Sequence, residues 1–221
     1  MTYNEWSDSK FVEHYNQNYA MSVEDINKYM TELKLNSNDV LIDFGCGCGD
    51  IVDAGSHIAQ MAVGVDSSEF QIKLAEQRLK GRKNTKVIHS SFLDCDISNF
   101  KITKAFSRKA LHHLTDDEKM TFIKKIAPNF EKKAIFYIED GFFNFDKTIL
   151  KQKIDDIMAE AAAYYGNRFE KIKKDFTSTI LDEYITDYAT WEKIFTSCGF
   201  EIVEKRPRVM FYGTLIARKI E

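Results

Sequence analysis

Short apolar runs alternate along this chain with segments in which apolar residues recur every three or four positions. An apolar run of roughly four to eight residues is typical of a buried strand, and the helical spacing is typical of a helix that covers one. The runs lie at 40–44, 61–66, 85–90, 104–107, 133–139, 201–204 and 209–218. The alternation predicts a single doubly wound α/β domain with a mostly parallel, Rossmann-like sheet.

Helices are also predicted outside this alternation. Two short ones precede residue 40, the first capped by Ser7 or Asp8 and the second starting at Ser22. Two amphipathic segments between 150 and 180 are separated by Gly166, which is a natural helix stop. This pair is an insertion after the fifth predicted strand, and from spacing alone it is a plain helical hairpin or a homodimer contact.

The predicted strand at 40–44 leads into a glycine-rich turn, with Gly45, Gly47 and Gly49 at alternate positions. Glycine tolerates positive φ and lets a ligand approach main-chain amides that a side chain would screen. Helical spacing resumes at Ile51, so we expect the turn to present free N–H groups at a helix N-terminus. Strand, turn and helix together predict a nucleotide-type binding site.

A second predicted strand, at 61–66, ends in a carboxylate, Asp66. An acid in this place, about twenty residues beyond the glycine turn, can accept hydrogen bonds from two ribose hydroxyls. Ser68 and Gln71 then form a capping pattern for the next helix. A nucleoside-containing ligand is therefore expected.

Composition narrows the classes of partner. The 221 residues carry a net charge of −3, with no basic excess of the kind that a nucleic-acid surface needs. No apolar run approaches the length of a membrane span and residues 1–6 do not resemble a signal peptide, so we expect a cytoplasmic protein without a membrane partner. The 4 cysteines suit a reducing compartment. Cys46 and Cys48 lack a second pair at ligand spacing, so we expect no metal site.

The glycine turn resembles motif I of the class I S-adenosylmethionine-dependent methyltransferases, an apolar strand followed by an acid and GxGxG. The stretch ALHHL at 110–114 is similar to the segment after their fourth strand. The resemblance covers 40–218. It implies a seven-stranded sheet whose last strand is antiparallel, a helical lid, and S-adenosylmethionine as cofactor. On this basis the chain divides into an N-terminal cap (1–39), a cofactor core (40–140), a lid (141–185) and a C-terminal part (186–221).

The resemblance also assigns residues to the cofactor. Asp43 would lie near the methionine ammonium and Asp66 at the ribose. A cation beside a sulfonium is unfavourable unless it faces a carboxylate, so Arg108 is expected either to bind an acid group of the cofactor or substrate or to form a surface salt bridge. Family members usually have an acid where this chain has Ser91, so the adenine contact falls to Ser91 and Phe92, or to Asp94 if the loop is shifted. The full expected cofactor set is Asp43, Gly45, Cys46, Gly47, Gly49, Asp66, Ser67, Ser91, Phe92 and Arg108.

The resemblance indicates the catalytic and substrate-binding residues less directly than the cofactor-binding residues. A neutral histidine can accept a proton from a nucleophile, and we expect His112 to face the substrate while His113 packs internally. Glu139 and Asp140 close the fifth predicted strand as a ligand-binding pair or as an ordinary turn. The expected substrate-binding residues are Tyr15, Tyr19, Glu139, Tyr165 and Arg168, and Tyr3 is a further candidate.

Methyl transfer to an O, N, S or C atom of a small molecule is thus the predicted reaction. One alternative is a non-catalytic S-adenosylmethionine-binding or regulatory protein. A second is an NAD-dependent oxidoreductase, which the GxGxG spacing disfavours because dinucleotide folds carry GxGxxG.

Overall fold

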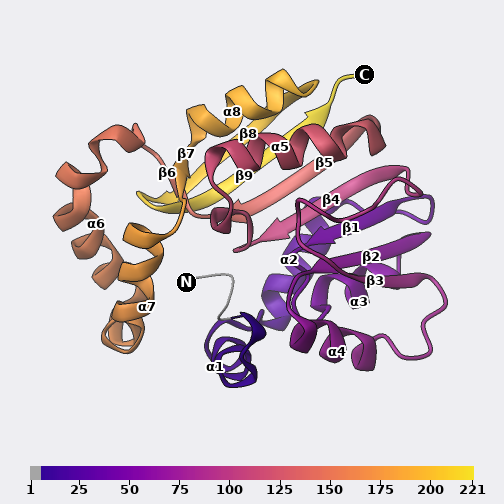
Figure 1. Ribbon diagram of the computed structural model, residues 1–221, viewed down its shortest axis with the longest axis horizontal. Coiled ribbons are helices and arrows are strands. Elements are labelled where there is room, and N and C mark those ends of the chain that lie inside the picture. The colour runs from indigo at the N-terminus through magenta and orange to yellow at the C-terminus, as the bar shows by residue number, and fades with distance from the viewer. Residues whose placement is uncertain (1–5) are drawn as a thin grey trace.

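The structure, a computed structural model, describes residues 6–221 and is built on one seven-stranded sheet (Figure 1). The strand order is β3-β2-β1-β4-β5-β9-β8, and β9 runs antiparallel to both of its neighbours. The predicted mostly parallel sheet with an antiparallel last strand is confirmed. The strands are β1 (Val40–Phe44), β2 (Met61–Asp66), β3 (Thr85–His89), β4 (Ile102–Arg108), β5 (Phe130–Asp140), β8 (Phe200–Val209) and β9 (Tyr212–Lys219).

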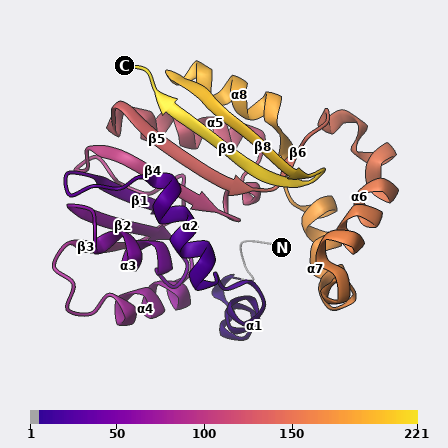
Figure 2. The same cartoon turned by 180° about the vertical axis from the view of Figure 1, so that it is seen from behind.

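Helices cover both faces of the sheet (Figures 1 and 2). On one face lie α2 (Val23–Leu33), α3 (Asp50–Ser56) and α4 (Glu69–Arg78), and on the other lie α5 (Asp116–Ile126) and α8 (Tyr188–Ser197). No helix within residues 6–221 is both long and apolar enough to cross a membrane.

Alternate residues of β1 fill the two cores. Ile42 and Phe44 pack with α5 and α8, whereas Leu41 packs with Tyr29 of α2. All four side chains are at most 1% exposed. Because successive strand residues point to opposite faces, a strand covered on both sides must be apolar throughout, which is the pattern read from the sequence.

Predicted caps fix several helix starts. The Asp8 side chain caps α1 (Ser9–Tyr19), and α2 begins with a capping box between Ser22 and Asp25. A second capping box, between Thr115 and Glu118, starts α5. The structure also contains short 3-10 helices, which are η2 (Leu111–His113), η3 (Ala127–Asn129), η4 (Lys147–Ile149) and η5 (Gly166–Arg168).

The helical insertion stands to one side of the sheet, across from α1 (Figure 1). It consists of α6 (Leu150–Tyr165) and α7 (Phe169–Asp182), which pack around Phe211. Two short strands, β6 (Phe142–Phe143) and β7 (Thr186–Asp187), pair in parallel where the insertion leaves and rejoins the core. The sequence predicted the two helices but not the pairing of β6 with β7.

Candidate active site

The glycine turn lies at the carboxyl end of β1, beside the end of β4. In open α/β sheets, ligands bind at this edge where the strand order reverses. Gly45 has φ +82°, and a Cβ there would come within 2.4 Å of the Ala110 Cβ. The N–H groups of Gly45 and Cys46 both donate to the Val65 carbonyl, at 2.8 and 3.1 Å. The turn therefore needs glycine at 45 in order to pack against the segment that follows β4.

Asp66 is bound directly to this turn. Its Oδ2 accepts the Gly47 N–H at 2.8 Å, and its Oδ1 accepts the Ser68 N–H at 2.9 Å. Burial raises the pKa of Asp66, although these N–H groups oppose the rise. The carboxylate is thus held in one orientation with lone pairs left for a ligand hydroxyl.

A cavity of about 680 Å³ opens beside these groups, and we call it the cofactor cavity. Seven of the ten expected cofactor residues line it: Gly45, Gly47, Asp66, Ser67, Ser91, Phe92 and Arg108. Asp43 and Cys46 line a smaller adjoining cavity, together with Arg108. Gly49 lines neither, and its Cβ position faces Ala75 of α4 at 3.1 Å. That glycine serves helix packing rather than ligand contact.

Asp43 is 2% exposed, and its charge is poorly solvated. Burial, then the nearby Asp66 and Asp50 carboxylates, raise its pKa well above the ordinary value. A cation placed in the adjoining cavity would favour the ionised form. The residue is therefore suited to an ammonium group.

The missing acid at position 91 is replaced by a neighbour. Ser91 Oγ donates to Asp94 Oδ2 at 2.6 Å, and the Asp94 N–H donates back to Ser91 Oγ at 3.1 Å. Both residues line the cofactor cavity with Phe92. Asp94 thus brings a carboxylate to the wall where the sequence comparison with the family expected one.

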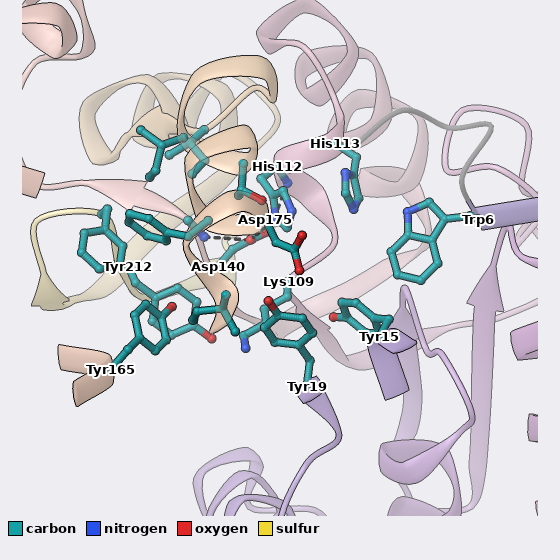
Figure 3. Close-up of a pocket in the computed structure, with 17 residues that line it drawn as sticks. Trp6, Tyr15, Tyr19, Lys109, His112, His113, Asp140, Tyr165, Asp175 and Tyr212 are labelled. Carbon is teal, nitrogen blue, oxygen red and sulfur yellow. Dashed lines mark hydrogen bonds and ion pairs between the residues drawn. The ribbon is translucent and has the colours of Figure 1, made fainter. Parts of the chain in front are cut away.

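A second cavity, of about 90 Å³, adjoins the first, and we call it the acceptor cavity (Figure 3). Its walls are mainly aromatic. Trp6, Tyr15, Lys109 and His113 line both cavities, so these side chains mark the junction between them. The aromatic lining residues are Trp6, Tyr15, Tyr19, Tyr165, Phe176, Phe211 and Tyr212. Burial raises the pKa of Tyr15 and Tyr19 to about 12, so both keep their hydroxyl protons at neutral pH and can donate hydrogen bonds.

Asp140 organises the polar end of the acceptor cavity. Its Oδ2 accepts the N–H groups of Ala110, Leu111 and His112, at 3.3, 2.8 and 3.1 Å. Its Oδ1 lies 2.5 Å from His112 Nδ1. One carboxylate thereby fixes both the turn after β4 and the first histidine ring.

Glu183, which follows α7, joins the two histidines. Its Oε2 lies 3.0 Å from His112 Nε2 and 3.0 Å from His113 Nδ1. Burial disfavours the charged form of His112, but Asp140 and Glu183 outweigh it and raise the pKa of His112 to about 10. Burial and the neighbouring His112 charge lower the pKa of His113. At neutral pH the cluster therefore holds an imidazolium at His112 and a neutral ring at His113.

His112 lines the acceptor cavity, in agreement with the expectation that it faces the substrate, whereas His113 was expected to pack internally and lines both cavities. Both His112 nitrogens are within reach of carboxylates, and its side chain is 10% exposed. The His113 side chain is 25% exposed and lines both cavities. In the tautomer that carries its proton on Nδ1, which lies 3.0 Å from Glu183 Oε2, the Nε2 lone pair of His113 can accept a proton.

Metal binding was predicted to be absent, on the evidence of the cysteines. In the part of the chain that the structure describes, the groups with metal-ligand spacing are His112, His113 and Glu183, whose ligand atoms lie within 4.8 Å of one another. Cys46 is buried in the core cluster that contains Tyr29, and the Cys48 thiol lies 3.4 Å from Asp50. The imidazolium of His112 lies between two carboxylates, Asp140 and Glu183, and offsets the charge of one of them.

Two expected substrate residues lie outside both cavities. Glu139 is 1% exposed and accepts hydrogen bonds from Tyr29 Oη at 2.6 Å and Tyr212 Oη at 2.9 Å, and it pairs with Arg208. Arg168 is exposed and donates to the Asn18 carbonyl at 3.0 Å. Tyr15, Tyr19 and Tyr165 do line the acceptor cavity. Tyr3 lies outside the described residues.

Lys109, Asp140, Asp175 and Glu183 complete the acceptor side, and none was among the expected substrate or catalytic residues. The position of Asp140 at the end of the fifth strand is predicted by the sequence. Glu183 could not be placed, because only the fold returns the end of α7 to the histidines. Lys109 has φ +51°, a left-handed conformation that its sequence context does not signal.

Comparison with known proteins agrees with this geometry. The family model described as a methyltransferase domain matches residues 41–131. An uncharacterized methyltransferase of Bacillus thuringiensis is 26% identical over 170 residues, which is 75% of this chain and 71% of that protein. An uncharacterized methyltransferase of Oceanobacillus iheyensis is 25% identical over 125 residues. That match spans 57% of this chain and 57% of the relative's own length, a little over half of each.

Solved structures share the fold at low sequence identity. Magnesium protoporphyrin IX methyltransferase from Synechocystis with bound SAH has a TM-score of 0.67 and 14% identity, over 97% of each chain. An S-adenosylmethionine-dependent methyltransferase from Clostridium acetobutylicum has a TM-score of 0.67 and 11% identity, over 96% of this chain and 98% of that one.

Proposed function

We propose that the chain, which belongs to the class I S-adenosylmethionine-dependent methyltransferases, methylates a small molecule bound in its acceptor cavity. The observation that carries the proposal is the junction of the two cavities at Tyr15, Lys109 and His113. A nucleoside-sized cavity opens there onto a small aromatic one. Such an arrangement suits a compact acceptor better than a polymer.

The residues of the cofactor cavity fit S-adenosylmethionine. Asp66 is oriented for the ribose hydroxyls, Asp94 with Phe92 for the adenine, and Asp43 for the methionine ammonium. Arg108 lies 3.7 Å from Glu139 through its Nε and lines the same small cavity as Asp43, where it suits the methionine carboxylate. The bound cofactor supplies an electrophilic methyl group on a sulfonium.

His113 would take the proton of the acceptor as the methyl group is transferred. As the acceptor atom bonded to the methyl group, the sulfonium–methyl bond would break and leave a neutral thioether. The bond from the acceptor atom to its proton would break as well, and Nε2 of His113 would receive that proton. Glu183 then stabilises the charged His113 ring through Nδ1. The imidazolium of His112, held by Asp140, fixes Glu183 in place from its other side.

Alignment supplies most of the remaining rate. Holding two reactants in line can remove about 7–11 kcal/mol from a barrier. The junction is lined by Tyr15, Trp6 and Lys109, which would limit the orientations that the acceptor can adopt. A strong base is therefore unnecessary, and a neutral imidazole is sufficient.

Titration calorimetry with S-adenosylmethionine tests the cofactor site. Wild type is expected to bind it, and Asp66→Ala is expected to bind about 100-fold more weakly, since charge-assisted hydrogen bonds are worth roughly 1.5–3 kcal/mol each. Asp96→Ala, which removes an exposed carboxylate, is the matched control and should bind like wild type. Tighter binding of NADH than of S-adenosylmethionine would contradict the assignment.

Methyl transfer itself is tested with methyl-labelled S-adenosylmethionine and a cell extract separated by molecular mass. Label is expected in the low-mass fraction and not in nucleic acid or protein. Cofactor binding without any transfer of label would instead support a non-catalytic binding protein.

Chelation is expected to leave the protein unchanged. Asp140 and Glu183 already hold the His112 imidazolium from both sides, so the cluster needs no metal ion to keep its geometry, and dialysis against EDTA should not shift the midpoint of thermal unfolding. A lower midpoint that zinc restores would show that His112, His113 and Glu183 hold a metal ion instead.

A further inference from the structure

Lys109 occupies the junction of the two cavities, where its side chain lies close to Tyr19 (Figure 3). Its backbone has φ +51°, and its N–H donates to the Glu139 carbonyl at 2.9 Å. A non-glycine residue in this conformation is strained, and such strain persists only where the surroundings enforce it. Here Asp140 enforces it by binding the next three N–H groups of the chain.

The Lys109 ammonium has aromatic neighbours but no carboxylate partner. Nζ lies 5.2 Å from the centre of the Tyr19 ring and 5.8 Å from that of Tyr212. Among residues 6–221, no carboxylate lies within ion-pair distance of it. Burial and the adjacent Arg108 lower its pKa to about 7. Burial of a cation without a counter-ion is unfavourable because the charge loses its hydration. An anion bound beside Nζ would offset much of this desolvation free energy.

The nearest carboxylates are already engaged. Glu139 pairs with Arg208 and Arg108, and Asp140 pairs with His112. Asp175, which also lines the acceptor cavity, lies 3.5 Å from His14 Nε2. Among residues 6–221 these carboxylates leave Lys109 without an ion pair, and a carboxylate of the ligand can supply one.

The two adjacent cations face different ligands. Arg108 lines the cofactor cavity and the small cavity that contains Asp43, but not the acceptor cavity. Lys109 lines the cofactor and acceptor cavities, but not the small one. Arg108 is thus placed for the carboxylate of the cofactor, and Lys109 is placed for the acceptor.

We propose that Lys109 binds an anionic group of the acceptor, and that the acceptor is a small carboxylic acid with an apolar or aromatic body. A single ammonium suits a singly charged carboxylate, whereas phosphate groups favour several cations or an arginine fork. The aromatic walls suit an apolar body. A cationic acceptor is disfavoured at the junction, because protonated Lys109 and the sulfonium would both repel it.

This inference rests on the proposed function, and binding experiments separate the two. The probes are benzoate, 4-hydroxybenzoate and indole-3-acetate, each compared with its own carboxamide, by calorimetry on protein saturated with S-adenosylhomocysteine. The expected result is that at least one acid binds about tenfold or more tightly than its amide, as a charge-assisted contact predicts. Lys109→Met keeps the apolar stem and should abolish that difference, whereas Lys101→Met, at an exposed position, should retain it.

Three results would overturn the inference: amides that bind as tightly as the acids, no binding by any of the three acids, or a Lys109→Met variant that loses affinity for S-adenosylhomocysteine instead. The last result would assign Lys109 to the cofactor. If wild type fails to bind S-adenosylhomocysteine at all, the proposed function itself fails. If it binds S-adenosylhomocysteine and shows no preference for acids, only the inference about Lys109 fails.

Discussion

Replacement of His113 by alanine is expected to lower kcat by about 10²–10⁴-fold, the usual contribution of a positioned general base. Both His113 and Lys109 line the cavity junction and have lowered pKa values, but Lys109 is proposed to bind the anionic group of the acceptor, and the neutral His113 ring is the group that can accept a proton. The measurement is single-turnover transfer from methyl-labelled S-adenosylmethionine to an acceptor found by screening. Affinity for the cofactor, measured by calorimetry, should change much less than kcat.

The pH profile separates a base from a structural residue. Wild-type activity should fall as pH drops through the lowered pKa of His113, because the protonated ring cannot accept a second proton. The residual activity of His113→Ala should lack that step. His57→Ala, which removes a histidine that lines neither cavity, is the control and should match wild type. Equal losses of cofactor affinity and kcat in His113→Ala, with an unchanged pH profile, would contradict the role.

The fold was predictable because its signals are local. Apolar runs, caps and the glycine turn each depend on a few adjacent residues, and Gly45 and Asp66 are brought together by the ends of two neighbouring strands. Most residues that line the cofactor cavity could therefore be predicted from the sequence. Asp94 could be named as a substitute acid because it is three residues from Ser91 on the same loop.

The acceptor side depends on contacts that no local pattern encodes. Glu139 and Asp140 are adjacent on β5, so their side chains must point to opposite faces. Asp140 faces the histidines, whereas Glu139 faces Tyr29 of α2. The interpretation of the two residues as a ligand-binding pair, one of the two given from sequence, does not take this alternation into account. Glu183 reaches the cluster only after the chain has passed through α6 and α7.

The same cluster predicts a large effect on stability. Asp140→Ala leaves three buried N–H groups and the His112 imidazolium without their carboxylate. Removal of one partner from a buried charged pair costs about 3–5 kcal/mol of the free energy of unfolding. Asp140→Asn keeps an oxygen that accepts from the backbone, so its loss at pH 6 should be smaller. The measurement is urea denaturation at pH 6 and pH 9, with Asp96→Asn as the exposed control.

The dependence on pH follows from the direction of each shift. Burial raises the pKa of Asp140, but the charge of His112 outweighs it and lowers the pKa overall, so the stability from Asp140 is present above its unfolded pKa and lost in acid. The pKa of His112 is raised to about 10, so its contribution is complete below its unfolded pKa of about 6.5 and is lost as pH rises toward 10. The difference between wild type and Asp140→Asn should therefore be larger at pH 6 than at pH 9. An equal difference at both values would show that His112 is neutral in the folded protein, and His113 would then lose the neighbouring charge that keeps it unprotonated.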